Sequence, residues 1–488
     1  MTRYCRALIS VADKTSVAEL AKSLIELDIE ILSTGGTAHA LRQHGIAVTD
    51  VSQVTGFPEI MDGRVKTLHP KIHGGLLGRR GQDEQIMQQH GIKPIDILVV
   101  NLYPFEATVS RADCTRNDAI ENIDIGGPAM IRAAAKNHAC VAVVVDPADY
   151  ETIIAELSTE ETSLSDASRE RLATKAFAHT ASYDAAIYNY LFDENTENRL
   201  PENYPLPLKK DRALRYGENP HQRAALYSLP RHNSGTVISA NQHQGKSLSY
   251  NNIADADAAL ECVKTLQESA CVIVKHANPC GVGIAQNSLE AYEKAYATDP
   301  TSAFGGIIAM NQIVDGALAN TIIDRQFLEV MVAPGYTADA IEAFKRKPNV
   351  RILDTGPLSP TQPGFRVHQV AGGILLQDND ILSINREALK VVTERQPDDR
   401  ELADAMLAWD VARFTKSNAI VYCKNGATIG VGAGQMSRVM SAKIAAWKAK
   451  DAGLAVSDAA MASDAFFPFR DGIDIAAEHG ITVVIPDV

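Results

Sequence analysis

The stretch Cys271–Ala285 reads Cys-Val-Ile-Val-Lys-His-Ala-Asn-Pro-Cys-Gly-Val-Gly-Ile-Ala and indicates an α/β fold. Its short apolar run, Val272–Val274, is typical of a strand with both faces covered. The run stops at Lys275 and His276, and the turn-prone Asn278-Pro279 then precedes two glycines. We expect the strand to open into a glycine-containing loop. A buried strand that brings a base and a cation to its carboxyl end suits an α/β active site, although many strands simply end in a solvated lysine.

Composition places the chain among soluble globular proteins. Its 488 residues are too many for one ordinary domain, so two or three are expected. No apolar run approaches a membrane span, and the first residues lack the apolar core of a signal peptide. The formal net charge of −13 disfavours nucleic acid as a partner. Local cationic clusters must therefore attract any anionic substrate.

The seven cysteines are odd in number and scattered, without CxxC or CxH pairs. This pattern argues for reduced thiols in a cytosol, and against a disulfide framework or a zinc site. We therefore expect a cytoplasmic protein without a metal.

The first part of the chain alternates strand and helix, with expected strands at 7–11 and 29–32 and a helix at 15–27 between them. The segment Ser33–Thr37 follows the second strand and precedes another helix. Small residues at such a junction expose backbone N–H groups that suit a phosphate. Ser10 and Lys14, at the end of the first strand, should lie beside it. The alternative is a tight turn whose hydroxyl groups cap the helix.

The segment Gly63–Gly75 carries three cations and two histidines in an otherwise acidic chain. Mutual repulsion between these cations suggests a bound anion, although a solvated loop is the alternative.

A buried strand at 95–100 ends in Asn101–Phe105, and Glu121–Pro128 then leads into an expected helix at 129–136. The dipole of that helix should favour the anionic form of Asp124. The glycines before the helix, Gly126 and Gly127, leave room for a ligand. A long amphipathic helix is expected over about 166–191.

Residues 193–211 are acidic and then proline-rich, which indicates an interdomain connector. We expect one domain over 1–195, a linker over 196–211 and a second domain over 212–488.

The second part repeats its own theme. A helix near 402–411 leads to a strand at 419–423 and a hairpin-like Lys424-Asn425-Gly426. The glycines of 429–438 resemble a dinucleotide-binding motif only loosely. The aromatic segment 463–472 suggests a pocket or dimer seam, or core packing under a loop.

These motifs resemble those of the bifunctional purine biosynthesis enzymes, and the resemblance runs nearly from end to end. Four segments are similar to the IMP cyclohydrolase domain: Gly63–Pro70, Asn101–Phe105, Asn122–Gly127 and Ala133–His138. Four others are similar to the domain that formylates 5-aminoimidazole-4-carboxamide ribonucleotide (AICAR): Arg215–Gln222, Lys275–Gly281, Ser417–Gly426 and Ser463–Asp471. The resemblance implies a methylglyoxal-synthase-like parallel-sheet domain, then two cytidine-deaminase-like α/β units, in an intertwined homodimer.

In the transformylase half, the resemblance implies formyl transfer from 10-formyltetrahydrofolate to the 5-amino group of AICAR. This poor nucleophile needs a base, for which His276 is the candidate because histidine exchanges protons near neutral pH. Lys275 and Asn418 are candidates for holding the oxyanion and shuttling a proton. The resemblance places the following residues at the nucleotide or the shared site: Arg215, Tyr216, Phe304, Glu329, Arg438 and Phe467.

In the cyclohydrolase half, the formylated product FAICAR closes to IMP with loss of water. Its carboxamide nitrogen attacks a formyl carbon in the same molecule, so positioning supplies much of the rate. The resemblance implies a phosphate cradle of Ser10, Lys14, Ser33, Thr34, Gly35, Gly36 and Thr37, with Arg64 close by. The matching catalytic positions are Lys66, Thr67, Tyr103, Asp124 and Lys136. We expect the two lysines to polarise oxygens, and Asp124 and Tyr103 to handle protons.

One departure from the family pattern concerns the end of the chain. The family continues through a further helix and strand to a basic, aromatic tail beside the AICAR pocket, whereas this sequence stops at Ile485–Val488. The shortened end makes full transformylase activity a weaker expectation than cyclohydrolase activity.

Two other functions stay open at this point. A phosphate-sensing regulatory module needs the cradle but not Lys66, Asp124 and Lys136. A zinc-dependent nucleobase deaminase is suggested by Pro279-Cys280, but the second cysteine and the His-x-Glu of that class are missing.

Overall fold

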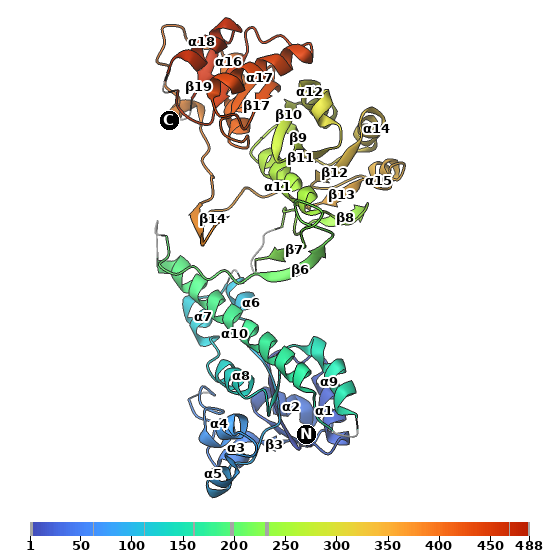
Figure 1. The fold of residues 1–488 in the computed structure, drawn as a ribbon, viewed down its shortest axis with the longest axis vertical. Helices are drawn as coiled ribbons and strands as arrows, with labels where there is room; N and C mark the ends of the chain where they lie inside the picture. The colour runs from blue at the N-terminus through green and yellow to red at the C-terminus, as the bar shows by residue number, and fades with distance from the viewer. Residues whose placement is uncertain are drawn as a thin grey trace. The chain divides into compact units, whose positions relative to one another are not determined.

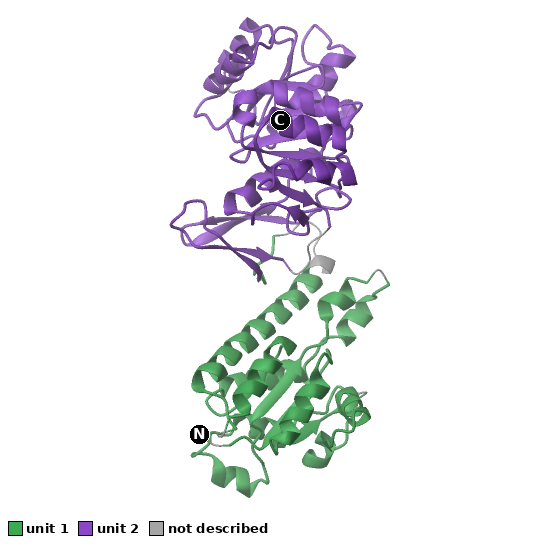
Figure 2. Cartoon of the chain, turned by 90° about the vertical axis from the view of Figure 1, so that its right-hand side faces the viewer, with its two compact units in different colours: residues 1–208 green, residues 209–488 purple. Residues whose placement is uncertain are grey.

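The computed structural model describes residues 3–61, 63–111, 113–159, 162–195, 200–229, 234–467 and 469–486. The chain divides into two compact units, residues 1–208 and 209–488, coloured separately in Figure 2. The expected linker, 196–211, spans this division, and its first part, 196–199, lies outside the described residues. In the part of the chain that is described, no helix is both long and apolar enough to cross a membrane.

The described strands of the first unit form one parallel sheet in the order β3-β2-β1-β4-β5. Figure 1 labels β3 and the helices of this unit. This parallel sheet was predicted for the N-terminal domain. Strands β1 and β4 lie side by side, but the chain leaves them toward opposite edges of the sheet, so their carboxyl ends form a switch point where ligands bind. The strands are β1 (Arg6–Val11), β2 (Glu30–Ser33), β3 (Thr49–Asp50), β4 (Ile97–Asn101) and β5 (Ala142–Val144).

Helices cover both faces of this sheet. Leu8 and Leu98 face a core with α4, α8 and α10, while Ile9 and Val99 face another with α1, α2 and α9. This alternation gives buried side chains on both sides of each central strand. The helices are α1 (Val17–Glu26), α2 (Gly35–Gln43), α3 (Val51–Thr55), α4 (Pro70–Leu77), α5 (Glu84–Gln89), α6 (Phe105–Val109), α7 (Arg116–Glu121), α8 (Gly126–Lys136), the 3₁₀ turn η1 (Pro147–Asp149), α9 (Tyr150–Leu157) and α10 (Asp166–Asn195).

The second unit is built on a mixed sheet, whose described strands run in the order β19-β18-β16-β17-β10-β9-β11-β12-β13-β8. Two ribbons, β6–β7 and β14–β15, lie outside this sheet. The strands are β6 (Lys209–Leu214), β7 (Ala224–Ser228), β8 (Asn241–Gln244), β9 (Ser269–Lys275), β10 (Asn278–Ala285), β11 (Gly306–Met310), β12 (Leu328–Ala333), β13 (Arg351–Asp354), β14 (Phe365–Val370), β15 (Gly373–Asp378), β16 (Ile420–Lys424), β17 (Ala427–Gly432), β18 (Ala460–Ser463) and β19 (Val483–Ile485).

An internal repeat organises this sheet. The run β10-β9-β11-β12 has the same order and directions as β17-β16-β18-β19, and β10 pairs with β17 where the two halves meet. The two α/β units expected from the resemblance are therefore visible as one topology used twice. The helices are α11 (Tyr250–Lys264), α12 (Ser288–Thr298), α13 (Pro300–Ala303), α14 (Gly316–Arg325), α15 (Ala338–Phe344), the 3₁₀ turn η2 (Arg386–Ala388), α16 (Asp399–Ala412), α17 (Arg438–Asp451) and α18 (Asp471–Glu478).

One core runs across both halves of the repeat. Helices α11 and α16 cover it on one face of the sheet. The other face has separate clusters under α12, α14 and α15 in the first half, and under α17 and α18 in the second. The two halves therefore share the arrangement of helices over the sheet as well as the strand order.

The glycine-containing loop expected after Lys275 is not a loop, and this expectation was wrong. Residues Asn278–Ala285 form strand β10, which pairs antiparallel with β9. Gly281 lets α12 approach closely, because a Cβ there would lie 2.0 Å from the carbonyl oxygen of Ala295. Gly430 on β17 has the same relation to α17, with 2.2 Å to the oxygen of Ala445. These glycines therefore serve strand–helix packing.

Candidate functional site

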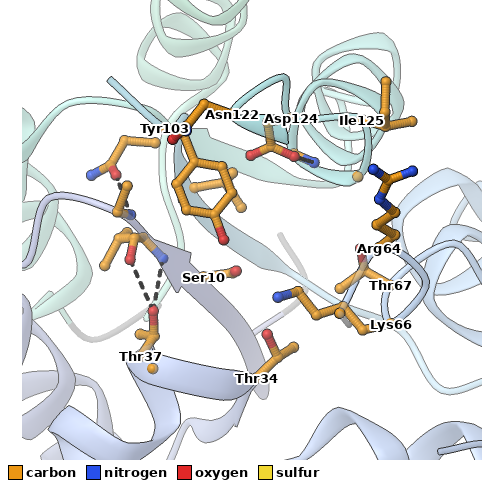
Figure 3. Close-up of a pocket in the computed structure, with 18 of the residues that line it drawn as sticks. Ser10, Thr34, Thr37, Arg64, Lys66, Thr67, Tyr103, Asn122, Asp124 and Ile125 are labelled. Atoms are coloured by element: carbon orange, nitrogen blue, oxygen red, sulfur yellow. Dashed lines mark hydrogen bonds between the residues drawn. The ribbon is translucent and has the colours of Figure 1, made fainter. Parts of the chain in front are cut away.

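A cavity of about 1220 Å³ opens at the switch point between β1 and β4 (Figure 3). The loop before α4 and the first turn of α8 complete its wall. The predicted site residues that line it are Ser10, Lys14, Thr34, Gly36, Thr37, Arg64, Lys66, Thr67, Tyr103, Asp124, Gly126 and Gly127. Three other predicted residues, Ser33, Gly35 and Lys136, are not among the residues that line it.

Asn101 holds the loop after β1 in place, and the sequence reasoning did not single out its side chain. Its side-chain oxygen accepts hydrogen bonds from the backbone amides of Ala12 (2.6 Å) and Asp13 (2.9 Å). Its amide nitrogen donates back to the oxygen of Asp13 at 3.1 Å. The sequence feature that could have indicated this role is an asparagine at the end of a buried strand.

The hydroxyl groups of the expected phosphate cradle are partly used within the fold. Ser33 is completely buried and donates to the oxygen of Ile9 at 2.7 Å. Thr37 accepts from the amide of Val11 and donates to its oxygen, both at 3.0 Å. These bonds fix the start of α2 against β1, and Thr34 and Gly36 are left to face the cavity.

The cationic segment 63–75 is divided between two roles. Arg64 and Lys66 line the cavity, whereas Lys71 belongs to α4 and donates to the oxygen of Val54 at 3.2 Å. Arg64 pairs with Glu121, and the nitrogen of Lys66 lies 3.9 Å from a carboxylate oxygen of Glu59. Repulsion among these cations is thus relieved by carboxylates and by separation. Repulsion alone therefore does not require a bound anion, and anion binding by this segment stays a prediction.

Asp124 sits at the entry to α8 with its carboxylate largely buried. The carboxylate accepts a hydrogen bond from the Gly127 amide, and the Asp124 amide donates to the Tyr183 hydroxyl at 2.7 Å. Burial raises the pKa of Asp124, and this effect outweighs the Gly127 amide and the charge of Lys66, which both lower it. Desolvation therefore outweighs the expected effect of the helix terminus and shifts the balance toward the neutral carboxyl.

The reactive side chains of the first cavity converge. In Figure 3 the Lys66 ammonium and the Tyr103 hydroxyl both point into the cavity, with Ser10 and Thr34 beside them and Asp124 on the opposite wall. Lys136 does not join this group. It is exposed at the end of α8, about 15 Å along the helix from Gly126. Gly126, by contrast, lies close to the Thr67 hydroxyl at the cavity.

A second cavity, of about 860 Å³, lies in the second unit where β6, β8, β12 and β13 approach α11. Arg215, Tyr216 and Glu329 line it, so three predicted residues from distant segments come together. Glu329 forms a 2.6 Å ion pair with Arg351, and the guanidinium of Arg215 lies 5.5 Å from the centre of the Tyr216 ring. Residues that the sequence reasoning missed are Lys246, Ser247 and Arg351, all on this wall.

Neither Lys275 nor His276 is among the residues that line this cavity. The ammonium of Lys275 donates to the carbonyl oxygens of Phe304 (3.0 Å) and Gly305 (2.9 Å). Lys275 and Glu329 lie at the same end of strands β9 and β12, with only β11 between them. Their backbones are therefore about 10 Å apart. The Phe304 side chain is exposed, and its ring centre lies 5.6 Å from that of Phe327.

The turn that carries His276 also meets the segment that carries Asn418. Asn278 donates to the oxygen of His276 and accepts from the amide of Lys416, both at 2.9 Å. The side chain of Asn418 donates to the oxygen of Gln435 at 2.8 Å. The structure thus brings Lys275, His276 and the Asn418 segment to one place, from both halves of the repeat.

Arg438 and Phe467 belong to the second half of the repeat. Arg438 begins α17 and lies 3.8 Å from Asp464, and its Nε has no hydrogen-bond partner among the described residues. Phe467 packs against the core cluster under α17, beside Gly472, which matches the core-packing alternative for the aromatic segment. Pro468 of that segment lies outside the described residues.

Among the described residues, no group of three or more His, Cys, Asp or Glu side chains is arranged to hold a metal ion. Cys280, the residue behind the deaminase alternative, is buried, and burial raises the pKa of its thiol to about 12. Burial therefore favours the neutral thiol over the thiolate.

Comparison with known proteins adds two family matches. The model for the AICARFT/IMPCHase bienzyme matches residues 134–448, and the model for the MGS-like domain matches residues 16–129. Among solved structures, the chain titled "Crystal structure of ForH" is 34% identical with a TM-score of 0.35, and the match covers 39% of this chain and 99% of that one. These matches give no support to a sensor or a deaminase.

Proposed function

Because the chain belongs to the AICARFT/IMPCHase bienzyme family, we propose that its two units divide the two reactions of that family between them. The chain is an enzyme of the last two steps of IMP synthesis, with formyltransferase and IMP cyclohydrolase activities. We assign ring closure to residues 1–195 and formyl transfer to residues 212–488, joined by the linker at 196–211. The formyl donor used by this family is formyltetrahydrofolate, and here we propose its 10-formyl form.

For ring closure, the first cavity holds FAICAR with its formyl and carboxamide groups together. The carboxamide nitrogen attacks the formyl carbon, the hydroxyl of the resulting adduct leaves as water, and IMP is formed. Lys66 polarises the formyl oxygen, and Asp124 and Tyr103 move the protons. A carboxyl group whose pKa is raised by burial can deliver a proton as well as accept one, which suits the departure of water.

The phosphate of the nucleotide is proposed to lie at the N-terminus of α2, where Thr34 and Gly36 face the cavity. Helix α2 directs backbone N–H groups and the positive end of its dipole toward this position. Lys14 and Arg64 on the cavity wall add positive charge. The other proposed contacts are Ser10, Ser33, Gly35, Thr37, Thr67, Gly126 and Gly127.

For formyl transfer, the second cavity holds AICAR through Arg215, Tyr216 and Glu329. The 5-amino nitrogen attacks the formyl carbon of the donor, His276 takes the amine proton, and the bond from that carbon to N10 breaks as N10 gains a proton. Lys275 spends two of its three N–H donors on carbonyl oxygens, which leaves one for the oxyanion. Asn418 assists the proton transfer. Further proposed contacts are Phe304, Arg438 and Phe467.

Lys136 stays a proposal carried by the resemblance alone, since the described cavity does not include it. A homodimer and a cytoplasmic location are likewise proposed from the resemblance. Small molecules are the substrates: AICAR, FAICAR and the folate.

The observation that carries the proposal is the convergence of Lys66, Tyr103 and Asp124 on one cavity at the switch point. The test supplies FAICAR to the purified chain and follows IMP by its absorbance. We expect turnover by the wild type and a loss of at least about 100-fold in Lys66→Ala. No turnover by the wild type, or full activity in Lys66→Ala, contradicts the assignment.

A further inference from the structure

We propose that Asp255 is a positioning residue for formyl transfer, because its carboxylate fixes the turn that presents His276. The inference rests on the proposed role of His276 as the base, and the experiment below separates the failure of one from the failure of the other.

The turn has an unusual backbone for its sequence. Strands β9 and β10 are joined through His276 and Ala277, which have φ values of 51° and 55°, between the paired residues Lys275 and Asn278. Positive φ at both central positions is the type I′ hairpin turn, which strongly favours Asn-Gly. Alanine does not favour this region, so the turn needs stabilisation from its surroundings.

Asp255 on α11 supplies that stabilisation. Its two carboxylate oxygens accept hydrogen bonds from the backbone amides of His276 (3.2 Å) and Ala277 (2.8 Å). The carbonyl oxygen of His276 is held as well, by the Asn278 side chain at 2.9 Å. Both backbone polar groups of His276 are therefore fixed, while its side chain remains exposed to a substrate.

The second half of the repeat contains the same arrangement without the histidine. Its turn, Asn425-Gly426, has φ values of 56° and 73°, and Asp404 on α16 accepts from the two amides at 2.9 and 2.8 Å. Asp404 is only 2% exposed and lies 3.6 Å from Arg400. It is therefore more buried than Asp255. Where the first turn is followed by Asn278, the second is followed by Ala427.

The comparison separates fold from function. An aspartate that clamps the hairpin is common to both halves, and it holds an intrinsically favourable Asn-Gly turn in one of them. In the other half it holds a turn with a less suitable sequence, which carries the proposed base. A catalytic group displaced by about 1 Å loses roughly 100-fold in rate. Asp255 is therefore expected to act on the rate of formyl transfer through the position of His276.

The experiment uses the full chain and four variants: Asp255→Asn, Asp404→Asn, His276→Ala and the double variant Asp255→Asn/Ala277→Gly. The asparagine side chain introduced by Asp255→Asn replaces one of the two accepting oxygens by an NH2 group, so an N–H donor then faces one of the two turn amides. Tetrahydrofolate formation from AICAR and formyl-folate is measured as kcat and KM. Conversion of FAICAR to IMP by the same samples reports on the first unit.

We expect Asp255→Asn to lower kcat for formyl transfer by roughly 10- to 100-fold, with KM for AICAR within about twofold. Asp404→Asn keeps kcat within about twofold, although it breaks the more buried clamp. Ala277→Gly in the double variant restores most of the lost rate, because glycine adopts positive φ without strain. IMP formation from FAICAR is unchanged throughout.

Several results overturn the inference while His276 stands as the base: a wild-type kcat in Asp255→Asn, an equal loss in Asp404→Asn, or no recovery in the double variant. A wild-type rate in His276→Ala instead removes the proposed base itself. Should Asp255→Asn fail to fold, Asp255→Glu keeps the charge and displaces the two oxygens. A folded Asp255→Glu protein with wild-type kcat overturns the inference equally.

Discussion

The carboxylate of Asp124 accepts a 2.8 Å hydrogen bond from the backbone amide of Gly127, in the first turn of α8. That turn, the loop of Lys66 and the end of β4 enclose the first cavity. Burial nevertheless raises the pKa of Asp124, so a carboxyl group in a fixed position holds its proton more strongly than it would in water.

Replacing Asp124 by asparagine should separate stability from activity. The amide oxygen of asparagine can still accept from Gly127, so we expect the variant to fold and to unfold at a similar or higher temperature near pH 7. It cannot exchange a proton, and IMP formation from FAICAR should fall by roughly 100- to 10,000-fold. Retention of wild-type turnover by the folded variant rules out the proton-transfer role.

The raised pKa of Asp124 also predicts a dependence of stability on pH. The folded pKa lies above the ordinary value of 3.8, so the neutral form favours the folded state. The contribution is full below pH 3.8 and is lost as the pH rises through the folded pKa. Wild type should therefore lose stability relative to Asp124→Asn as the pH increases from about 4. Urea unfolding of the two proteins across this range measures it, and a constant or opposite difference contradicts the sign.

Lys66 and Lys136 make a matched pair for testing the cavity. Lys66→Ala should reduce IMP formation by at least about 100-fold, because its ammonium points into the cavity. Lys136 is exposed at the far end of α8, so Lys136→Ala tests its proposed catalytic role separately from the described cavity. A loss as large as that of Lys66→Ala supports the role that the resemblance implies, and a change of less than about threefold removes it.

Close strand–helix packing predicts a strong effect of small substitutions in the second unit. A Cβ at Gly281 or Gly430 would lie 2.0 or 2.2 Å from a helix carbonyl oxygen, so alanine there should cost about 1–3 kcal/mol or more. At Gly373, on an exposed strand, a Cβ meets nothing within 4 Å, and alanine should stay within about 0.5 kcal/mol. Denaturant unfolding of the second unit compares the three. Similar values for all three contradict the packing argument.

The parts of the fold that the sequence predicts well are the buried strands, which are continuous apolar runs. Apolar runs around Leu8 and Leu98 predicted strands, whereas the parallel sheet was expected from the family resemblance. Asn425-Gly426 correctly indicated a hairpin. The hairpin turn at His276 was not predicted, because its sequence lacks the Asn-Gly pair that such a turn favours. Its geometry depends on Asp255, twenty-one positions earlier by the numbering, and such a contact leaves no local pattern.

The predicted site was assembled only in part, for a similar reason. Motifs named Lys66, Tyr103 and Asp124, which do meet, but Arg351 was missed because nothing near it in the chain points to Glu329. The direction of the Asp124 pKa shift was not predicted, because the sequence places this residue before a helix but does not indicate its burial. The sequence indicates that Asp124 precedes a helix, but it does not indicate that its carboxylate is excluded from water.

If two separate cavities carry the two reactions, single substitutions should block one reaction and spare the other. AICAR and 10-formyltetrahydrofolate are incubated with wild type, His276→Ala and Lys66→Ala, and tetrahydrofolate, FAICAR and IMP are followed separately. We expect Lys66→Ala to release tetrahydrofolate at the wild-type rate and to accumulate FAICAR, while His276→Ala releases little tetrahydrofolate but still converts added FAICAR to IMP. Loss of both reactions in either folded variant, or tetrahydrofolate release at the wild-type rate by His276→Ala, would contradict this separation.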